Sequence, residues 1–243
     1  MELTDTAALV TGGAVRVGKA LTLALAGAGC DVFVHYGRSA GPAEETAAEA
    51  EALGARVAIG SADLGDPDAP AALVDQATAA LGPVQVLVNS ASGFATDTLR
   101  NVTRDGWRRT MAVTLEAPVF LTQAMANALP EDKPGAVVNV TDWRTARPYP
   151  DHFSYVLAKG GIDTFTTTAA AALAPRIRVN AVALGAILPP PGADASYLQD
   201  LAGRIPARRA GGVDVVTDAT LFLLRNDFVT GEIVRVDGGA HLV

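Results

Sequence analysis

Seven short apolar runs constrain the fold of this chain more than any other feature of its sequence. They are AALVT near residue 7, CDVFVHY near 30, ARVAIG near 55, VQVLVNSA near 84, GAVVNV near 135, IRVNAV near 177 and EIVRVDGG near 232. The runs are continuously apolar rather than alternating, which is typical of strands buried on both faces of a parallel sheet.

Helical patterns separate these runs, at about residues 16–28, 42–53, 67–81, 105–129, 152–174 and 213–225. Alternation of strand and helix predicts an α/β fold, a single doubly wound domain over residues 1–243 with seven parallel strands. Right-handed crossovers then place helices on both faces of the sheet. The proline-rich stretch Leu184–Ser196 follows the sixth strand, and we expect a substrate loop there, over about residues 184–212.

The composition excludes several classes of partner. A net charge of −7 provides no sequence-wide basic field for nucleic acid or an anionic membrane. Cys30 is the only cysteine, and no cluster has metal-ligand spacing, so we expect neither a disulfide nor a metal site. No signal peptide and no apolar run of about 18 residues or more is present. The sequence therefore predicts a cytoplasmic protein that acts on a small molecule.

The stretch TGGAVRVGKA follows the first apolar run and opens a helix. Gly12, Gly13 and Gly18 keep this turn small, and its free backbone N–H groups and the helix dipole favour an anion. Arg16 is unexpected there, because a cation at a helix start opposes the dipole by a few tenths of a kcal/mol. Either a negative group lies nearby, or the side chain swings into solvent.

The second strand ends in HYGRS, and no carboxylate occurs over residues 32–43. An enzyme that binds NAD normally has an acidic residue here for the ribose, whereas NADP requires donors for its 2′-phosphate. The candidate donors are His35, Tyr36, Arg38 and Ser39. A surface loop that happens to be basic is the alternative. Asp63, just past the third strand, is placed to accept from an adenine amino group.

Tyr155 and Lys159 lie four residues apart in a helical pattern, so they share a face. A neighbouring ammonium favours the phenolate, which predicts a tyrosine tuned toward neutral pH. Asp142 ends the fifth strand, where it faces the cleft and, held partly protonated, could pass a proton. The alternative is an N-terminal cap or an ion pair with Arg144 or Arg147.

Taken in order, TGGAVRVG, NSA, YVLAK, RVNAV and VDGG resemble the short-chain dehydrogenases/reductases over essentially the whole chain. The resemblance implies a single Rossmann domain, a homotetramer, Tyr155 as proton donor or acceptor, and Lys159 holding the nicotinamide ribose and lowering the tyrosine pKa. Thr114 stands where this family has an asparagine, and Leu184 where it has a proline.

Four departures resemble the pteridine reductases: Arg16, HYGRS, Asp142 in place of a serine, and Phe94 in NSASGF. The stretches VTDW and GGAHLV are similar to bacterial dihydromonapterin reductases. This resemblance implies an NADPH-dependent enzyme that transfers hydride to a pterin-type C=N bond of a dihydropterin, dihydromonapterin or dihydrofolate. Asp142 and Tyr155 would supply the proton, Arg16 would reach across the cofactor phosphates to the pterin, and Phe94 would stack on its ring.

The predicted cofactor residues are therefore Gly12, Arg16, Val17, Gly18, His35, Tyr36, Arg38, Ser39, Asp63, Leu64, Asn89, Ala91, Tyr155 and Lys159. The predicted substrate residues are Arg16, Ser92, Phe94, Asp142 and Tyr155, and the predicted catalytic residues are Asp142, Tyr155 and Lys159.

Two alternatives remain open. One is a carbonyl reductase of the same superfamily, acting on a 3-oxoacyl thioester or another ketone. Asp142 counts against it, because a carboxylate repels a developing oxyanion. The other is a non-catalytic NADP-binding sensor, a class that usually loses the tyrosine or the lysine, both of which are present.

Overall fold

A computed structural model describes residues 1–190, 192 and 195–243. Its centre is one sheet in which every neighbouring pair of strands is parallel, in the order β3-β2-β1-β4-β5-β6-β7. The strands are β1 (Ala7–Thr11), β2 (Asp31–Tyr36), β3 (Val57–Ser61), β4 (Val84–Asn89), β5 (Gly135–Asp142), β6 (Ile177–Leu184) and β7 (Ile233–Val236). The seven predicted strands and their parallel arrangement are confirmed.

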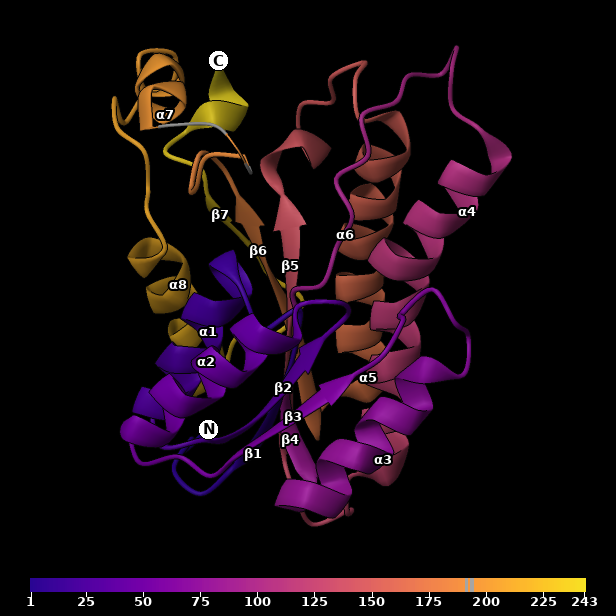
Figure 1. Ribbon diagram of the computed structural model, residues 1–243, viewed down its shortest axis with the longest axis vertical. Coiled ribbons are helices and arrows are strands. Elements are labelled where there is room, and N and C mark those ends of the chain that lie inside the picture. The colour runs from indigo at the N-terminus through magenta and orange to yellow at the C-terminus, as the bar shows by residue number, and fades with distance from the viewer. Residues whose placement is uncertain (191, 193–194) are drawn as a thin grey trace.

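Helices cover both faces of the sheet, as predicted (Figure 1). One face carries α1 (Arg16–Gly27), α2 (Ala40–Ala52) and α8 (Asp214–Arg225). The other face carries α3 (Ala69–Leu81), α5 (Ala117–Ala128) and α6 (Phe153–Leu173). Two apolar cores result, one on each side of the sheet, and the central strands contribute alternate side chains to both. The protein is thus a single doubly wound Rossmann-like domain.

The predicted helix over residues 105–129 is divided in the structure. It consists of α4 (Arg104–Met111), a π-helical turn η1 (Ala112–Glu116) and α5. Pro118 has no N–H to donate to the carbonyl of Thr114, and the N–H of Ala117 donates instead to Ala112, five residues back. The irregular turn places Thr114, fully buried, beside the carboxyl ends of the strands.

The segment predicted as a substrate loop contains a helix that its proline-rich sequence did not indicate, α7 (Ala195–Ala202). Residues 191, 193 and 194 of the predicted loop lie outside the described residues. Figure 1 shows α7 and the C-terminus of the chain beyond the ends of β6 and β7, near the short turn η2 (Trp143–Thr145) that follows β5. The segment is therefore placed over the end of the sheet where ligands of such folds bind.

The described residues include neither a helix that could span a membrane nor a group of side chains that could hold a metal ion. No helix within residues 1–190, 192 and 195–243 is long and apolar enough to cross a membrane. Across the same ranges, no group of three or more His, Cys, Asp or Glu side chains is arranged to hold a metal ion.

Candidate active site

A cleft of about 1220 Å³ lies beyond the carboxyl ends of the strands. At one end it is lined by the turn between β1 and α1 and by the residues after β2 and β3. At the other end it is lined by the residues after β5, by the start of α6 and by the segment from residue 184 to α7. It is large enough for a dinucleotide and a small substrate together.

The glycine-rich turn is held in place by its own backbone and by His35. The N–H of Gly12 donates to Nδ1 of His35 (3.1 Å), and the N–H of Gly13 donates to the His35 carbonyl (2.9 Å). Nε2 of the same ring therefore carries the proton and donates to the carbonyl of Ala62 (3.1 Å). A Cβ atom on Gly18 would lie 2.0 Å from the Gly12 carbonyl oxygen, so only glycine fits there.

His35 consequently has a supporting role that the sequence did not reveal. The ring is 2% exposed, and burial lowers its pKa, so it stays neutral. Both ring nitrogens already bond the protein. His35 borders the cleft, but with both nitrogens engaged it does not have a free donor for a phosphate; Arg38, which also borders the cleft, is exposed.

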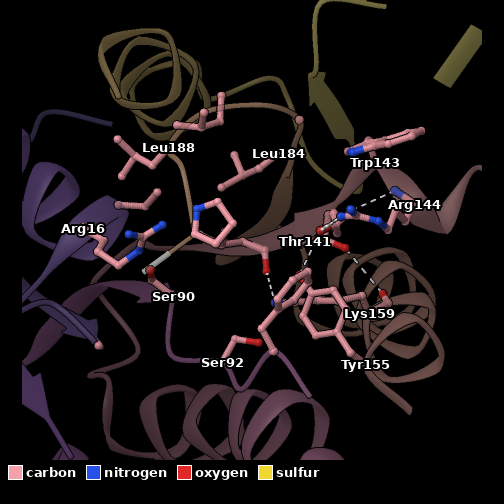
Figure 2. Close-up of a pocket in the computed structure, with 18 of the residues that line it drawn as sticks. Arg16, Ser90, Ser92, Thr141, Trp143, Arg144, Tyr155, Lys159, Leu184 and Leu188 are labelled. Carbon is pink, nitrogen blue, oxygen red and sulfur yellow. Dashed lines mark hydrogen bonds and ion pairs between the residues drawn. The ribbon is translucent and has the colours of Figure 1, made fainter. Parts of the chain in front are cut away.

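Arg16 has a backbone conformation that normally requires glycine. Its φ is +55°, in the left-handed region, which costs a residue with a side chain about 1–2 kcal/mol. Nη2 of its guanidinium donates to the carbonyl of Pro189 (2.7 Å). Figure 2 shows Arg16 on the wall of the pocket opposite Arg144. Arg16 therefore has a backbone conformation that suits glycine, and its side chain links the turn to the segment after β6.

Tyr155 and Lys159 lie on the first turns of α6, buried and facing β5. The Tyr155 hydroxyl donates to Oδ2 of Asp142 (2.9 Å), and Nζ of Lys159 donates to the carbonyl of Val140 (2.6 Å). Burial lowers the pKa of Lys159 to about 8. Burial, followed by the negative charge of Asp142, raises the pKa of Tyr155 well above its usual range.

This direction corrects our expectation that the ammonium makes the phenol more acidic. Nζ of Lys159 is 5.7 Å from the centre of the Tyr155 ring, whereas the Asp142 carboxylate bonds the hydroxyl directly. Burial, followed by the charge of Asp142, raises the pKa of the phenol, and the opposing cause is the Arg144 guanidinium. Tyr155 therefore holds its proton.

Asp142 combines the two roles that its sequence position left open. It caps the turn η2 by accepting the backbone N–H of Arg144 (2.9 Å), and its Oδ2 is 3.4 Å from Nη1 of the same arginine. That oxygen also accepts the Tyr155 hydroxyl. Every one of these contacts donates to the carboxylate, so Asp142 serves as an acceptor that fixes the phenol. Arg147 is exposed and does not border the cleft.

Phe94 and Ser92 lie on the segment after β4 and border the cleft. The Phe94 ring is 53% exposed, stacks on His152 (4.0 Å between ring centres) and meets the Tyr155 ring edge to face (4.9 Å). The Ser92 hydroxyl bonds the carbonyl of Gly93 (3.1 Å) and lies 3.4 Å from that of Thr114. The five predicted substrate residues thus border the same cleft.

A family model described as "Enoyl-(Acyl carrier protein) reductase" matches residues 13–241. A bovine (Bos taurus) L-xylulose reductase is 33% identical, with 98% of both chains covered. The chain belongs to the short-chain dehydrogenases/reductases. The 3-oxoacyl-[acyl-carrier-protein] reductase of Synechocystis, another relative of this reductase, is 31% identical, with 98% of this chain and 97% of that protein covered.

The fold of this short-chain dehydrogenase/reductase also resembles solved structures. The crystal structure of FolM alternative dihydrofolate reductase 1 from Brucella canis, complexed with NADP, superposes with a TM-score of 0.94. It is 37% identical in sequence, and the alignment covers 100% of this chain and 97% of that one. The relatives therefore include enzymes named for carbonyl substrates and for a pterin-containing substrate.

Most residues predicted to bind a cofactor border the cleft of this reductase. They are Gly12, Arg16, Val17, Gly18, His35, Arg38, Asp63, Leu64, Ala91, Tyr155 and Lys159. Tyr36, Ser39 and Asn89 do not border it. Asn89 is buried and donates to Asn139 (2.9 Å), and this bond joins the end of β4 to β5. Asp63 bonds Arg109 (2.7 Å), a partner on α4 that the sequence did not indicate.

Sequence reasoning missed one group at the substrate end. Trp143, Arg144 and Tyr149 all border the cleft beside Asp142. Arg144 had been considered only as an ion-pair partner, and nothing in the spacing of the two aromatic residues indicated that they would gather around it. The sequence feature that could have indicated this group is Asp142 as an N-cap. A carboxylate that caps a short turn holds the side chains that follow it on its own side of the cleft.

Proposed function

We propose that this protein is an NADPH-dependent reductase that transfers hydride to a C=N bond of a reduced pterin. The observation that carries the proposal is that Arg16, Phe94, Asp142 and Tyr155 border one cleft, with Tyr155 bonded to Asp142. A flat heteroaromatic ring is matched by an exposed aromatic face, and a C=N bond requires a proton at nitrogen as hydride reaches carbon.

The cofactor end of the cleft fits NADP. The glycine turn leaves no room for a Cβ at Gly18, and its backbone N–H groups together with the start of α1 favour a phosphate. Arg38 is exposed just past the end of β2, in a stretch of sequence without a carboxylate. FolM from Brucella canis, which is 37% identical, was crystallised with NADP. When bound, the cofactor supplies the hydride.

The residues of the chain supply the proton and the orientation. Asp142 accepts the hydroxyl hydrogen of Tyr155 and so orients the phenol before the reaction; as hydride arrives, that proton leaves the bond to Asp142 and passes to the substrate nitrogen, and Tyr155 becomes a phenolate. The buried ammonium of Lys159 stabilises the phenolate that remains, and it is itself oriented by the carbonyl of Val140. Phe94 offers its exposed face to the substrate ring.

A carbonyl reductase is the second candidate, and specific relatives favour it. L-xylulose reductase and 3-oxoacyl-[acyl-carrier-protein] reductase are more than 30% identical to the chain over nearly its whole length. The ionic contact of Asp142 with Arg144 argues against it, because the carboxylate would oppose an oxyanion at the same place. A non-catalytic sensor role receives no support from the complete Tyr155 and Lys159 pair.

Two further properties belong to the proposal through the family resemblance: a homotetramer and a cytoplasmic location. The tetramer is supported by apolar side chains on the outer surfaces of the long helices. Phe120 on α5 is 47% exposed and Leu157 on α6 is 45% exposed. Contacts between copies would cover such residues.

The proposal is tested by following NADPH absorbance with dihydrobiopterin, dihydrofolate and an acetoacetyl thioester. We expect turnover of a pterin substrate, and an Asp142→Ser variant should lose about 100-fold in kcat because the phenol is no longer held. The dissociation constant for NADPH should not change in that variant. Turnover of the thioester alone, or a fully active Asp142→Ser enzyme, would contradict the proposal.

A further inference from the structure

Arg144 is enclosed by aromatic rings at the substrate end of the cleft. Its guanidinium carbon is 5.7 Å from the ring centre of Phe94, 5.6 Å from that of Trp143 and 5.8 Å from that of Tyr149. Trp143 and Tyr149 also meet each other edge to face at 5.5 Å. Contacts of this kind hold a guanidinium in one place without using its N–H groups.

Most of the hydrogen-bonding capacity of this guanidinium is unused by the described residues. One donor, on Nη1, faces Asp142 at 3.4 Å. Nε is buried and has no partner among them. Because Nε has no exposed surface, a ligand in the cleft would be bound by the N–H groups at the Nη1 and Nη2 end of the guanidinium. The side chain is 22% exposed, and the residue borders the cleft.

Charged side chains of both signs border the cleft in this protein, which carries a net charge of −7. Arg16, Arg144 and Arg204 supply the positive charges. Asp142, which bonds Tyr155 and Arg144, and Asp151, which is 3.2 Å from Nδ1 of His152, supply negative ones. Figure 2 shows Arg16 and Arg144 on opposite walls of the pocket. The phosphates of a cofactor account for Arg16 but not for Arg144, which lies beyond Tyr155.

We propose that Arg144 determines substrate specificity by binding a carboxylate on the arm of the substrate that extends from its planar ring. A fork of N–H donors held by aromatic rings matches the two oxygens of a carboxylate. This inference rests on the proposed pterin chemistry and narrows it: the preferred substrate has an acidic arm, as dihydrofolate does, rather than a neutral polyhydroxyl arm.

The kinetic test compares two substrates that share a ring and differ in the arm, dihydrofolate and dihydrobiopterin. In an Arg144→Gln variant, the ratio of their kcat/KM values should fall at least about tenfold, the size of one lost charge-assisted bond. Arg144→Lys should retain much of the ratio, because it keeps the charge. Tyr155→Phe, which leaves Arg144 and its ion pair with Asp142 in place, should lower both kcat/KM values and leave the ratio unchanged, which separates specificity from proton transfer.

The matched control is Arg147→Gln, which removes the same charge three residues later from an exposed side chain that does not border the cleft. Its ratio should equal that of the parent. An Arg144→Gln ratio within twofold of the parent, or an equal fall in Arg147→Gln, overturns the inference while leaving pterin reduction intact.

A binding measurement separates this inference from the proposed function. Calorimetry on the enzyme with NADP⁺ gives dissociation constants for folate and for biopterin without turnover. We expect folate to bind the parent more tightly than biopterin and the advantage to be lost in Arg144→Gln. Absence of pterin turnover overturns the proposed function, whereas equal loss of both affinities in the variant, or no binding of folate, overturns the role of Arg144.

Discussion

The two ends of the cleft differ in which atoms shape them. At the first turn, backbone N–H groups make the hydrogen bonds: those of Gly12 and Gly13 bond His35, and those of Ser90 and Ala91 bond the Thr11 hydroxyl. After β5, side chains make the contacts. There the hydroxyl, carboxylate and guanidinium of Tyr155, Asp142 and Arg144 bond one another, and aromatic rings surround them.

This difference separates what the family shares from what distinguishes one member. A turn built from backbone atoms tolerates few residues, since a Cβ on Gly18 would collide with the Gly12 carbonyl. In the proposed function it binds the phosphates of the cofactor. A wall built from side chains can change with single substitutions and leave the backbone intact. We therefore expect variants at one end to alter catalysis and selection of the substrate, and variants at the other to alter affinity for the cofactor.

The largest effect should come from Tyr155→Phe. The ring, its burial and its edge contact with Phe94 are retained, but the proton that Asp142 holds in place is lost. We expect kcat to fall about 1000-fold, the range of general acid catalysis. Stopped-flow kinetics and fluorescence titration with NADPH would measure the two quantities. A parallel loss of NADPH affinity would show that the two ends are not independent.

A smaller effect, on the use of the cofactor rather than on kcat, should follow from Arg38→Gln. If Arg38 binds the 2′-phosphate, kcat/KM for NADPH should fall about tenfold or more, as for one lost charge-assisted bond. The value for NADH, which lacks that phosphate, should not change. Arg100→Gln, an exposed arginine that does not border the cleft, is the control. Equal losses with both cofactors would remove Arg38 from phosphate recognition.

The smallest effect concerns stability and Lys159. Its pKa is about 8 in the folded protein and about 10.5 when exposed, so between these values the folded state binds fewer protons than the unfolded state. The cost of burying the ammonium is thus complete below pH 8 and diminishes as pH rises toward 10.5. Relative to Lys159→Met, the Tm of the parent should rise by a few degrees from pH 7.5 to 9.5.

Calorimetry without cofactor would measure this difference. A gap between the two proteins that stays constant with pH would show that Lys159 does not titrate in this range. The same difference in Tm, measured in an Asp163→Asn background, would test the effect of Asp163 on Lys159. Burial raises the pKa of Asp163, and the charge of Asp163 raises the pKa of Lys159.

The sequence predicted features that depend on periodicity and on motif spacing. The seven strands, the helices on both faces and the meeting of Tyr155 with Asp142 follow from apolar runs and from the common end of parallel strands. The pattern did not predict α7, because prolines before it obscure a short helix with one apolar face. It did not predict the π-helical turn either, since Pro118 suits the first turn of an ordinary helix equally well.

The sequence predicted which residues make up the candidate site better than it predicted their contacts. It identifies candidate donors for a phosphate, but only the structure shows that both ring nitrogens of His35 already bond the protein. In the same way, the direction of the pKa shift of Tyr155 is set by its burial and by its contact with Asp142, which become known only from the structure. Such contacts are set by packing between α6 and β5, which no local pattern encodes.

The left-handed backbone at Arg16 has an evolutionary consequence. Because the turn already has the conformation that glycine prefers, arginine and glycine can exchange there without moving the loop. An ancestor could gain or lose the guanidinium, and with it the contact to Pro189, in one substitution. Glycine at this position would relieve the backbone strain and lose the hydrogen bond to Pro189. A single substitution at position 16 thus exchanges backbone strain for a link between the first turn and the segment after β6.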